Sequence, residues 1–131
     1  MASGALRVWM AVFIAGYLSP MISSLEKLLG TPRDGALLRY SLALEYLKAK
    51  DLERALQYFR DAVERDPLYS AAWKGLGRAL QDAGRDAEAL ATYRKGIEAA
   101  HKKGDRQAEK EMTVFMRRLE KGAPARGRDP K

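Results

Sequence analysis

Apolar side chains recur along the chain at intervals of three and four residues, which is the spacing of one face of an α-helix. The first series ends at Gly30 and predicts a short amphipathic helix over 21–29. No stretch alternates between polar and apolar residues for long enough to predict a strand. The fold class is therefore expected to be all-α, with longer helices over 34–49, 52–65, 70–83, 86–100 and 105–121.

Capping and breaking residues mark where these helices begin and end. Thr31 or Asp34 is the expected N-cap of the helix over 34–49, and Asp51 and Asp105 are the expected N-caps of the helices that follow them. Breaks in the chain are expected at Pro67, at Gly84 and in a loop over 101–105.

The two central helix pairs repeat the same pattern of small and large apolar residues with a period of 34 residues. Leu42 recurs as Leu76, Ala43 as Gly77, Ala55 as Ala89, Phe59 as Tyr93 and Ala62 as Gly96. Packing in a helical core requires small and large apolar residues to recur at matching positions, whereas a catalytic centre does not require such a repeat. A period of this length is typical of a solenoid, in which each helical hairpin buries its apolar face against the next.

The residues of the second copy carry a family resemblance. Trp73, Leu76, Gly77 and Leu80 are spaced as W-x₂-L-G-x₂-L and are followed by Ala89 and Tyr93. This pattern resembles the tetratricopeptide repeat (TPR) family. The first copy departs from it at Arg39, which stands at the Trp position, and the second at His101, which stands where the terminal Pro is expected. The expected repeat-packing residues are Leu42, Ala43, Tyr46, Ala55, Phe59, Ala62, Pro67, Trp73, Leu76, Gly77, Leu80, Ala89 and Tyr93.

The resemblance implies a TPR-type helical hairpin solenoid over 21–121. Its two repeats are expected at about 34–67 and 68–101, and the helix over 105–121 aligns with the start of a third repeat at a period of 36, so it is expected to cap the array. The chain from Met21 onward also resembles small bacterial single-domain TPR proteins of unassigned function, through Gly104, Asp105, Gln107 and the stretch EMTVFMRRL.

In the TPR family, the first helix of each pair lines a concave groove that binds a peptide. The residues expected to line it here are Leu37, Tyr40, Leu44, Leu47, Lys74, Arg78, Gln81, Lys110 and Arg117. The groove would be apolar at one end and basic at the other, which suits a partner peptide with an aliphatic anchor and acidic residues or a free C-terminal carboxylate.

Two alternatives to this groove stay open. In the first, the helix over 21–29 covers part of the apolar stripe formed by Leu37, Tyr40, Leu44 and Leu47. In the second, the basic residues are ordinary solvated charges. The family's carboxylate clamp for chaperone tails uses a Lys and an Asn where this chain has Tyr40 and Leu44, so the sequence argues against that activity.

The two ends of the chain have a different composition. Residues 1–20 contain an apolar run of 11 residues from Val8 to Leu18, against about 20 needed to span a bilayer. A translation start at Met21, a signal peptide or membrane tether, and a helix docked on the domain all remain open. Residues 122–131 combine Gly, Pro and charge and are expected to be a disordered basic tail. The expected location is cytoplasmic, or membrane-tethered or exported if residues 1–20 are translated.

Composition narrows the chemistry. The chain has no cysteine and one histidine, so disulfides, thiolate metal sites, a cysteine nucleophile and an HExxH motif are excluded. We expect a non-enzymatic protein without cofactor or metal, acting as an adaptor. Two other functions remain: self-association as a homodimer through Leu37, Tyr40, Leu44 and Leu47, or weak binding of nucleic acid or anionic surfaces. The net charge of the chain is +7, and most of it lies near the C-terminus, where residues 101–131 hold ten Lys or Arg and five Asp or Glu. Binding of nucleic acid or anionic surfaces is therefore expected only in that region.

Overall fold

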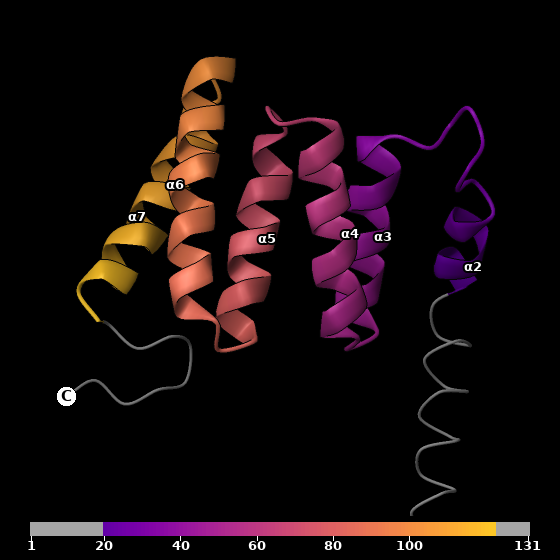
Figure 1. Cartoon of the computed structure of the whole chain (residues 1–131), viewed down its shortest axis with the longest axis horizontal. Coiled ribbons are helices and arrows are strands. Elements are labelled where there is room, and N and C mark those ends of the chain that lie inside the picture. Colours follow the sequence, from indigo (N-terminus) through magenta and orange to yellow (C-terminus); the bar gives the residue numbers. More distant parts are fainter. Residues whose placement is uncertain (1–19, 123–131) are drawn as a thin grey trace, which may run out of the picture.

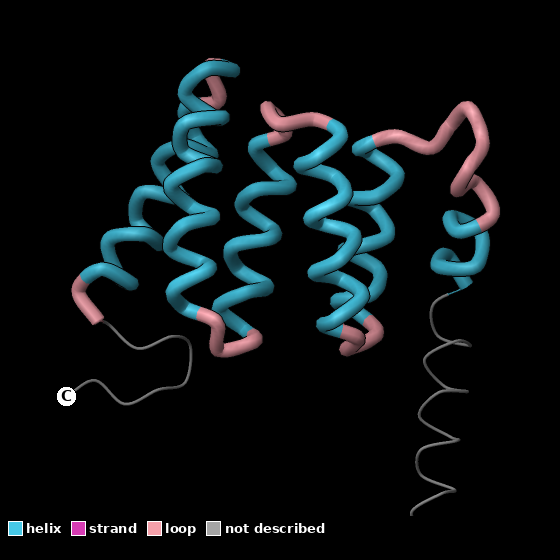
Figure 2. Tube along the Cα trace, viewed as in Figure 1, coloured by secondary structure: helices cyan, strands magenta, loops and turns pink. Residues whose placement is uncertain are grey.

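The computed structural model describes residues 20–122, and these form six α-helices and no strand (Figure 2). The predicted leader or tether over 1–20 and the predicted tail over 122–131 lie almost entirely outside the described residues. The helices are α2 (Pro20–Glu26), α3 (Ala36–Lys48), α4 (Leu52–Arg65), α5 (Ser70–Asp82), α6 (Asp86–Lys103) and α7 (Arg106–Glu120). The predicted all-α class is confirmed.

The helices stand side by side in chain order, with α2 at one end of the array and α7 at the other (Figure 1). The main packing contacts are within the hairpins α3–α4 and α5–α6 and between α6 and α7, while α4 packs against α5 to join the two hairpins. The helix α2 contacts α3 and contains no buried residue. Each hairpin therefore buries its apolar face against its neighbour, as in a helical repeat protein.

The residues that repeat in the sequence lie in the core between the helices. Leu42, Phe59 and Tyr93 are fully buried, and the small residues Ala55 and Ala89 are too. The repeat-packing residue Pro67 lies in the exposed linker instead, where its carbonyl oxygen accepts a hydrogen bond of 2.8 Å from Trp73 Nε1. Alternating small and bulky residues thus set the distance between helices.

Three glycines inside helices accept bulky side chains from neighbouring helices. A Cβ atom at Gly77 would collide with the ring of Tyr93, and one at Gly75 would lie 2.5 Å from Cε1 of Phe59. A Cβ atom at Gly96 would lie 2.5 Å from Sδ of Met112 and 2.7 Å from Cβ of Trp73, so α5, α6 and α7 all meet there. At each of these glycines, an added Cβ atom would force the facing side chain to shift.

The end of α6 differs from the sequence prediction. Residues 101–103 are helical rather than part of a loop, and the helix ends at Gly104 with φ of 80°. The reason is that His101 stands where the first repeat has Pro67, so no proline interrupts the helix. As a result α6 has 18 residues where α4 has 14, and a two-residue linker replaces the four residues 66–69. The longer helix and the shorter linker together produce the period of 36 that places α7.

Helix starts are partly as predicted. Asp51 accepts a hydrogen bond of 3.2 Å from the backbone N–H of Arg54, and Asp105 accepts one of 3.1 Å from that of Ala108, so both N-cap predictions are confirmed. The predicted N-cap of α3 is wrong, because Gly35 occupies that position without a side-chain bond. The first helix is also shorter than predicted, since 27–30 form turns after Glu26.

Candidate interaction surface

The predicted groove residues come from the first helix of each hairpin and from α7. The offsets of 34 and 36 residues align Leu44 with Arg78 and Val114, and Tyr40 with Lys74 and Lys110. We call the side chains at these aligned positions the α3–α5–α7 surface, which comprises Leu37, Tyr40, Leu44, Leu47, Ala71, Lys74, Arg78, Gln81, Gln107, Lys110, Val114 and Arg117.

The apolar stripe of α3 is divided between solvent, the core and α2. Leu37 is 68% exposed. Tyr40 instead packs inward, with its ring centroid 6.0 Å from that of Phe59 and 5.1 Å from that of Tyr69. Leu44 and Leu47 line a largely apolar hollow of about 520 Å³ together with Met21 and Leu25 of α2 and with Ser41, Glu45 and Lys48. The helix α2 therefore borders part of the stripe and leaves Leu37 open.

A buried phenol attaches α2 to the first hairpin. The hydroxyl of Tyr46 donates a hydrogen bond of 2.6 Å to Oε2 of Glu26, and Arg54 donates one of 3.4 Å to the same hydroxyl. Burial, together with the bond to Glu26, raises the pKa of Tyr46 above its usual value. Because α2 is otherwise poorly buried, this contact helps to hold it against α3.

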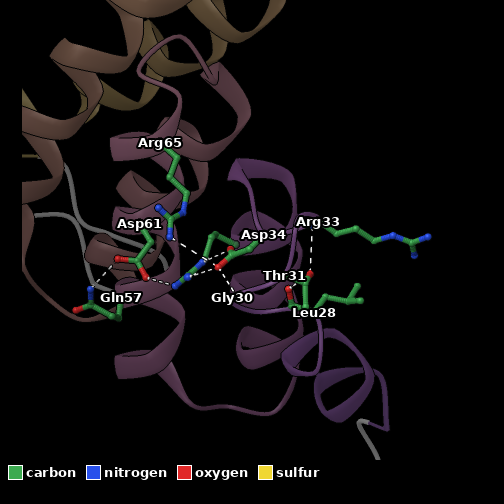
Figure 3. Close-up of polar contacts among 9 residues, drawn as sticks. Leu28, Gly30, Thr31, Arg33, Asp34, Gln57, Asp61 and Arg65 are labelled. Carbon is green, nitrogen blue, oxygen red and sulfur yellow. Dashed lines mark hydrogen bonds and ion pairs between the residues drawn. The ribbon is translucent and has the colours of Figure 1, made fainter.

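Arg39, which stands at the Trp position of the first repeat, forms an ion-pair network rather than a groove contact. Its partners Asp34 and Asp61 are labelled in Figure 3. Arg39 donates to both carboxylate oxygens of Asp34, at 2.9 and 2.8 Å, and to Asp61 at 3.0 Å. Asp34 also accepts the backbone N–H of Gly30 at 2.9 Å, and Arg65 lies 3.9 Å from it. The bonds from Arg39 and from Gly30 lower the pKa of Asp34 well below its usual range.

This network fixes the segment between α2 and α3 against α4. Sequence analysis noted Arg39 only as a departure from the family pattern and did not predict its partners. The sequence did contain a signal for this ion pair. Arg39 stands at a repeat position that should be largely buried, and Asp34, five residues earlier, is a carboxylate that could pair with it.

The predicted groove residues of α5 are engaged inside the domain. Lys74 Nζ lies 3.3 Å from Oε1 of Glu111 on α7, and the guanidinium of Arg78 lies over the ring of Phe115, 4.9 Å from its centroid. Gln81 accepts a short hydrogen bond from the hydroxyl of Tyr93. The middle of the surface thus contributes side chains that bind α5 to α6 and α7.

A carboxylate between α5 and α7 holds the starts of these two helices together. Asp105 caps α7 with one oxygen, and its other oxygen accepts a hydrogen bond of 2.6 Å from the hydroxyl of Ser70, the first residue of α5. Ser70 is 2% exposed. The bonds from Ser70 and from the Ala108 N–H lower the pKa of Asp105.

The exposed part of α7 is basic. Lys110 and Arg117 are exposed and have no ion-pair partner among the described residues, and Val114 between them is 47% exposed. The surface therefore has exposed aliphatic side chains at the α3 end and exposed cations at the α7 end. Of the four cations predicted to line a groove, Lys110 and Arg117 are exposed, whereas Lys74 and Arg78 contact α7.

Two other kinds of site were sought within the described part of the chain. No three His, Asp or Glu side chains between residues 20 and 122 gather closely enough to hold a metal ion. Over the same range, no helix combines the length and the apolar character needed to cross a membrane.

Comparison with known proteins gives a consistent set of relatives. The sequence profile of the tetratricopeptide repeat matches residues 40–103. A TPR repeat-containing protein of Pseudomonas aeruginosa is 50% identical over 101 residues, which are 77% of this chain and 96% of the relative. The solution structure of a Bordetella parapertussis protein is 40% identical with a TM-score of 0.66, over 77% of this chain and 88% of that one. The crystal structure of a TPR domain protein from Salinibacter ruber is 33% identical with a TM-score of 0.63, over 66% and 97%.

Proposed function

Because this chain belongs to the tetratricopeptide repeat family, whose fold generally mediates protein–protein interaction, we propose that it binds a polypeptide segment of a partner protein along the α3–α5–α7 surface. Proteins of this family are typically non-catalytic scaffolds. The proposal assigns this chain an adaptor role, in which the surface recognises the partner and the packed hairpins keep the surface rigid.

The observation that supports the proposal most is the position of the exposed aliphatic side chains. Leu37 is 68% exposed, Leu44 37% and Val114 47%, and all three occupy aligned positions of the first helices. Each exposed apolar side chain is ordinary by itself. Leu44 and Val114 share one aligned position, and Leu44 also lines the hollow of about 520 Å³ between α2 and α3, so these side chains favour a surface that a partner covers.

Site-specific photo-cross-linking in the native host tests the proposal. A benzophenone amino acid is placed at Leu37 or Leu44 and, as a matched control, at Leu68, which is 42% exposed but lies in the linker between α4 and α5. We expect one partner protein to be cross-linked from positions 37 and 44 and not from 68. Cross-linking from position 68 alone would place the interaction elsewhere and refute the proposal.

A second candidate function is self-association, which the 68% exposure of Leu37 also favours. In that case the exposed side chains of Leu37 and Leu44 of two copies would face each other, with Leu47 beside them, while Tyr40 of the predicted dimer face packs inward. Sedimentation at two protein concentrations separates the candidates. A monomer at both concentrations supports binding of a different protein, whereas a dimer weakened by Leu37→Ser supports self-association.

A further inference from the structure

We infer that α7 recognises acidic side chains of the bound segment, so that the partner presents an aliphatic residue to α3 and a run of Asp or Glu to α7. The inference rests on the proposed function, since it names the chemistry of the partner at the same surface. Among the cations predicted to line the groove, it assigns carboxylate binding to those of α7 rather than to Lys74 and Arg78 of α5.

The acidic residues of α7 are all turned toward neighbouring helices. Glu111 pairs with Lys74 of α5 at 3.3 Å. Glu109 lies 3.3 Å from Nδ1 of His101, and Glu120 lies 3.3 Å from Arg94, both on α6. Each of these three carboxylates therefore has its nearest basic or histidine partner on a neighbouring helix, and within the described part of the chain none forms an ion pair with a cation of α7.

Four basic residues, three of them in α7 and one at its C-cap, form a stripe along one side of the helix. At about 100° per residue, Arg106, Lys110, Arg117 and Lys121 fall within an arc of about 60° around the helix. All four are exposed, and none has an ion-pair partner among residues 20–122. With a rise of about 1.5 Å per residue, the stripe is about 22 Å long. It offers a linear set of donors for carboxylates spaced along one segment.

The cations of α5 are already engaged with α7. Lys74 is paired with Glu111, whose negative charge opposes a ligand carboxylate there, and Arg78 is packed over the ring of Phe115. A ligand carboxylate that contacts α7 displaces no such interaction. The recognition of acidic groups is therefore less costly on α7 than on α5.

The surroundings of the stripe favour a protein segment over a nucleic acid. A platform for nucleic acid needs exposed aromatic rings on which bases stack. The rings nearest this surface are used internally: Tyr40 packs on Phe59 and Tyr69, and Phe115 packs on Tyr93 beneath Arg78. The large apolar side chains that are exposed between residues 20 and 122 are aliphatic, and one of them, Val114, lies beside the stripe.

Two charge-reversed variants test the inference with defined ligands. The test variant is Lys110→Glu with Arg117→Glu. The matched control is Lys27→Glu with Arg33→Glu, which changes the net charge equally at the opposite end of the array, where the Arg33 side chain extends into solvent (Figure 3). Circular dichroism confirms that both variants fold.

The probe is a fluorescein-labelled synthetic peptide with leucines at one end and glutamates at the other, compared with a version carrying glutamine in place of glutamate and with a single-stranded DNA oligonucleotide. Fluorescence anisotropy reports binding to the full chain. We expect the glutamate peptide to bind, and the test variant, the glutamine peptide and raised salt each to weaken binding by about tenfold or more. The control variant should bind as the unaltered chain does.

The outcomes separate this inference from the proposed function. Binding that is insensitive to the test variant and to glutamine, but lost in Leu37→Ser with Leu44→Ser, overturns the acidic recognition and leaves the proposed surface in place. Binding of DNA but not of the glutamate peptide overturns the inference in favour of a nucleic-acid surface. Failure of the glutamate peptide to bind even at low salt also overturns it.

Discussion

Replacement of Gly77 by alanine tests whether the packing of α5 against α6 depends on the absence of a side chain. The added Cβ atom would lie 2.7 Å from Cδ1 and from Cζ of the Tyr93 ring. That ring is fully buried, and its hydroxyl is held by Gln81, so it has little room to move. We therefore expect Gly77→Ala to destabilise the protein, although alanine normally favours a helix.

The magnitude follows from two opposing terms. Inserting a methyl group into a closely packed site costs about 1–3 kcal/mol, and the rigid ring places this site near the upper limit. Replacing a helical glycine by alanine contributes about 1 kcal/mol in the other direction. The net loss in the free energy of unfolding is thus about 2 kcal/mol, which corresponds to a fall in Tm of about 10 °C for a domain of this size.

Urea unfolding followed by circular dichroism measures this loss. A second variant, Tyr93→Leu, removes the ring that the methyl group would meet, so Gly77→Ala should cost less in that background, with a coupling energy of about 1–2 kcal/mol. If Gly77→Ala is as stable as the unaltered chain, or if its effect is the same with and without the ring, the close approach of these helices does not determine their packing.

Two further predictions concern polar contacts that position the ends of the array. Tyr46→Phe removes the bond to Glu26, so amide hydrogen exchange over 20–29 should accelerate while global stability falls by only about 0.5–1.5 kcal/mol; Tyr58→Phe is the control, and equal exchange in both variants would show that the bond does not hold α2. Asp105→Ala removes the cap of α7 and leaves the buried Ser70 hydroxyl without its acceptor, so it should cost about 2 kcal/mol, more than the loss of the cap alone in Asp51→Ala. Because the pKa of Asp105 is lowered in the folded state, its contribution to stability is complete at pH values above the usual pKa of 3.8 and is lost as the pH falls below that value. An acid-unfolding profile of Asp105→Ala with the same shape as that of the unaltered chain would contradict this.

The helical hairpins could be predicted from the sequence because their core obeys a repeated rule of size. Where Phe59 or Tyr93 fills the space between helices, the facing position must be small, and this constraint is visible as the 34-residue register. The N-caps Asp51 and Asp105 were predictable for a similar reason, since a short acceptor before an apolar run has a local function.

The end of α6 and the electrostatics of the surface were harder to predict because they depend on contacts distant in the sequence. The lysines at 102 and 103 look like loop residues, and only the absence of a proline at His101 allows the helix to continue to Gly104. The partners of Lys74 and Arg78 depend on how α7 is rotated against α5, which the sequence pattern does not specify. The proposed partner chemistry is the same, but the acidic residues are now assigned to the cations of α7 for this reason.

The array has one weakly attached end and one firmly attached end. At Gly96, side chains of α5 and α7 both fill the space left by the missing Cβ atom, so α7 cannot separate from α6 without exposing Met112 and disturbing Trp73 of the preceding helix. At the other end, α2 buries no residue. Tension applied to the two ends of the array would therefore detach α2 first, leave the remaining five helices intact, and expose Leu44 and Leu47 to solvent by removing the α2 side of the hollow.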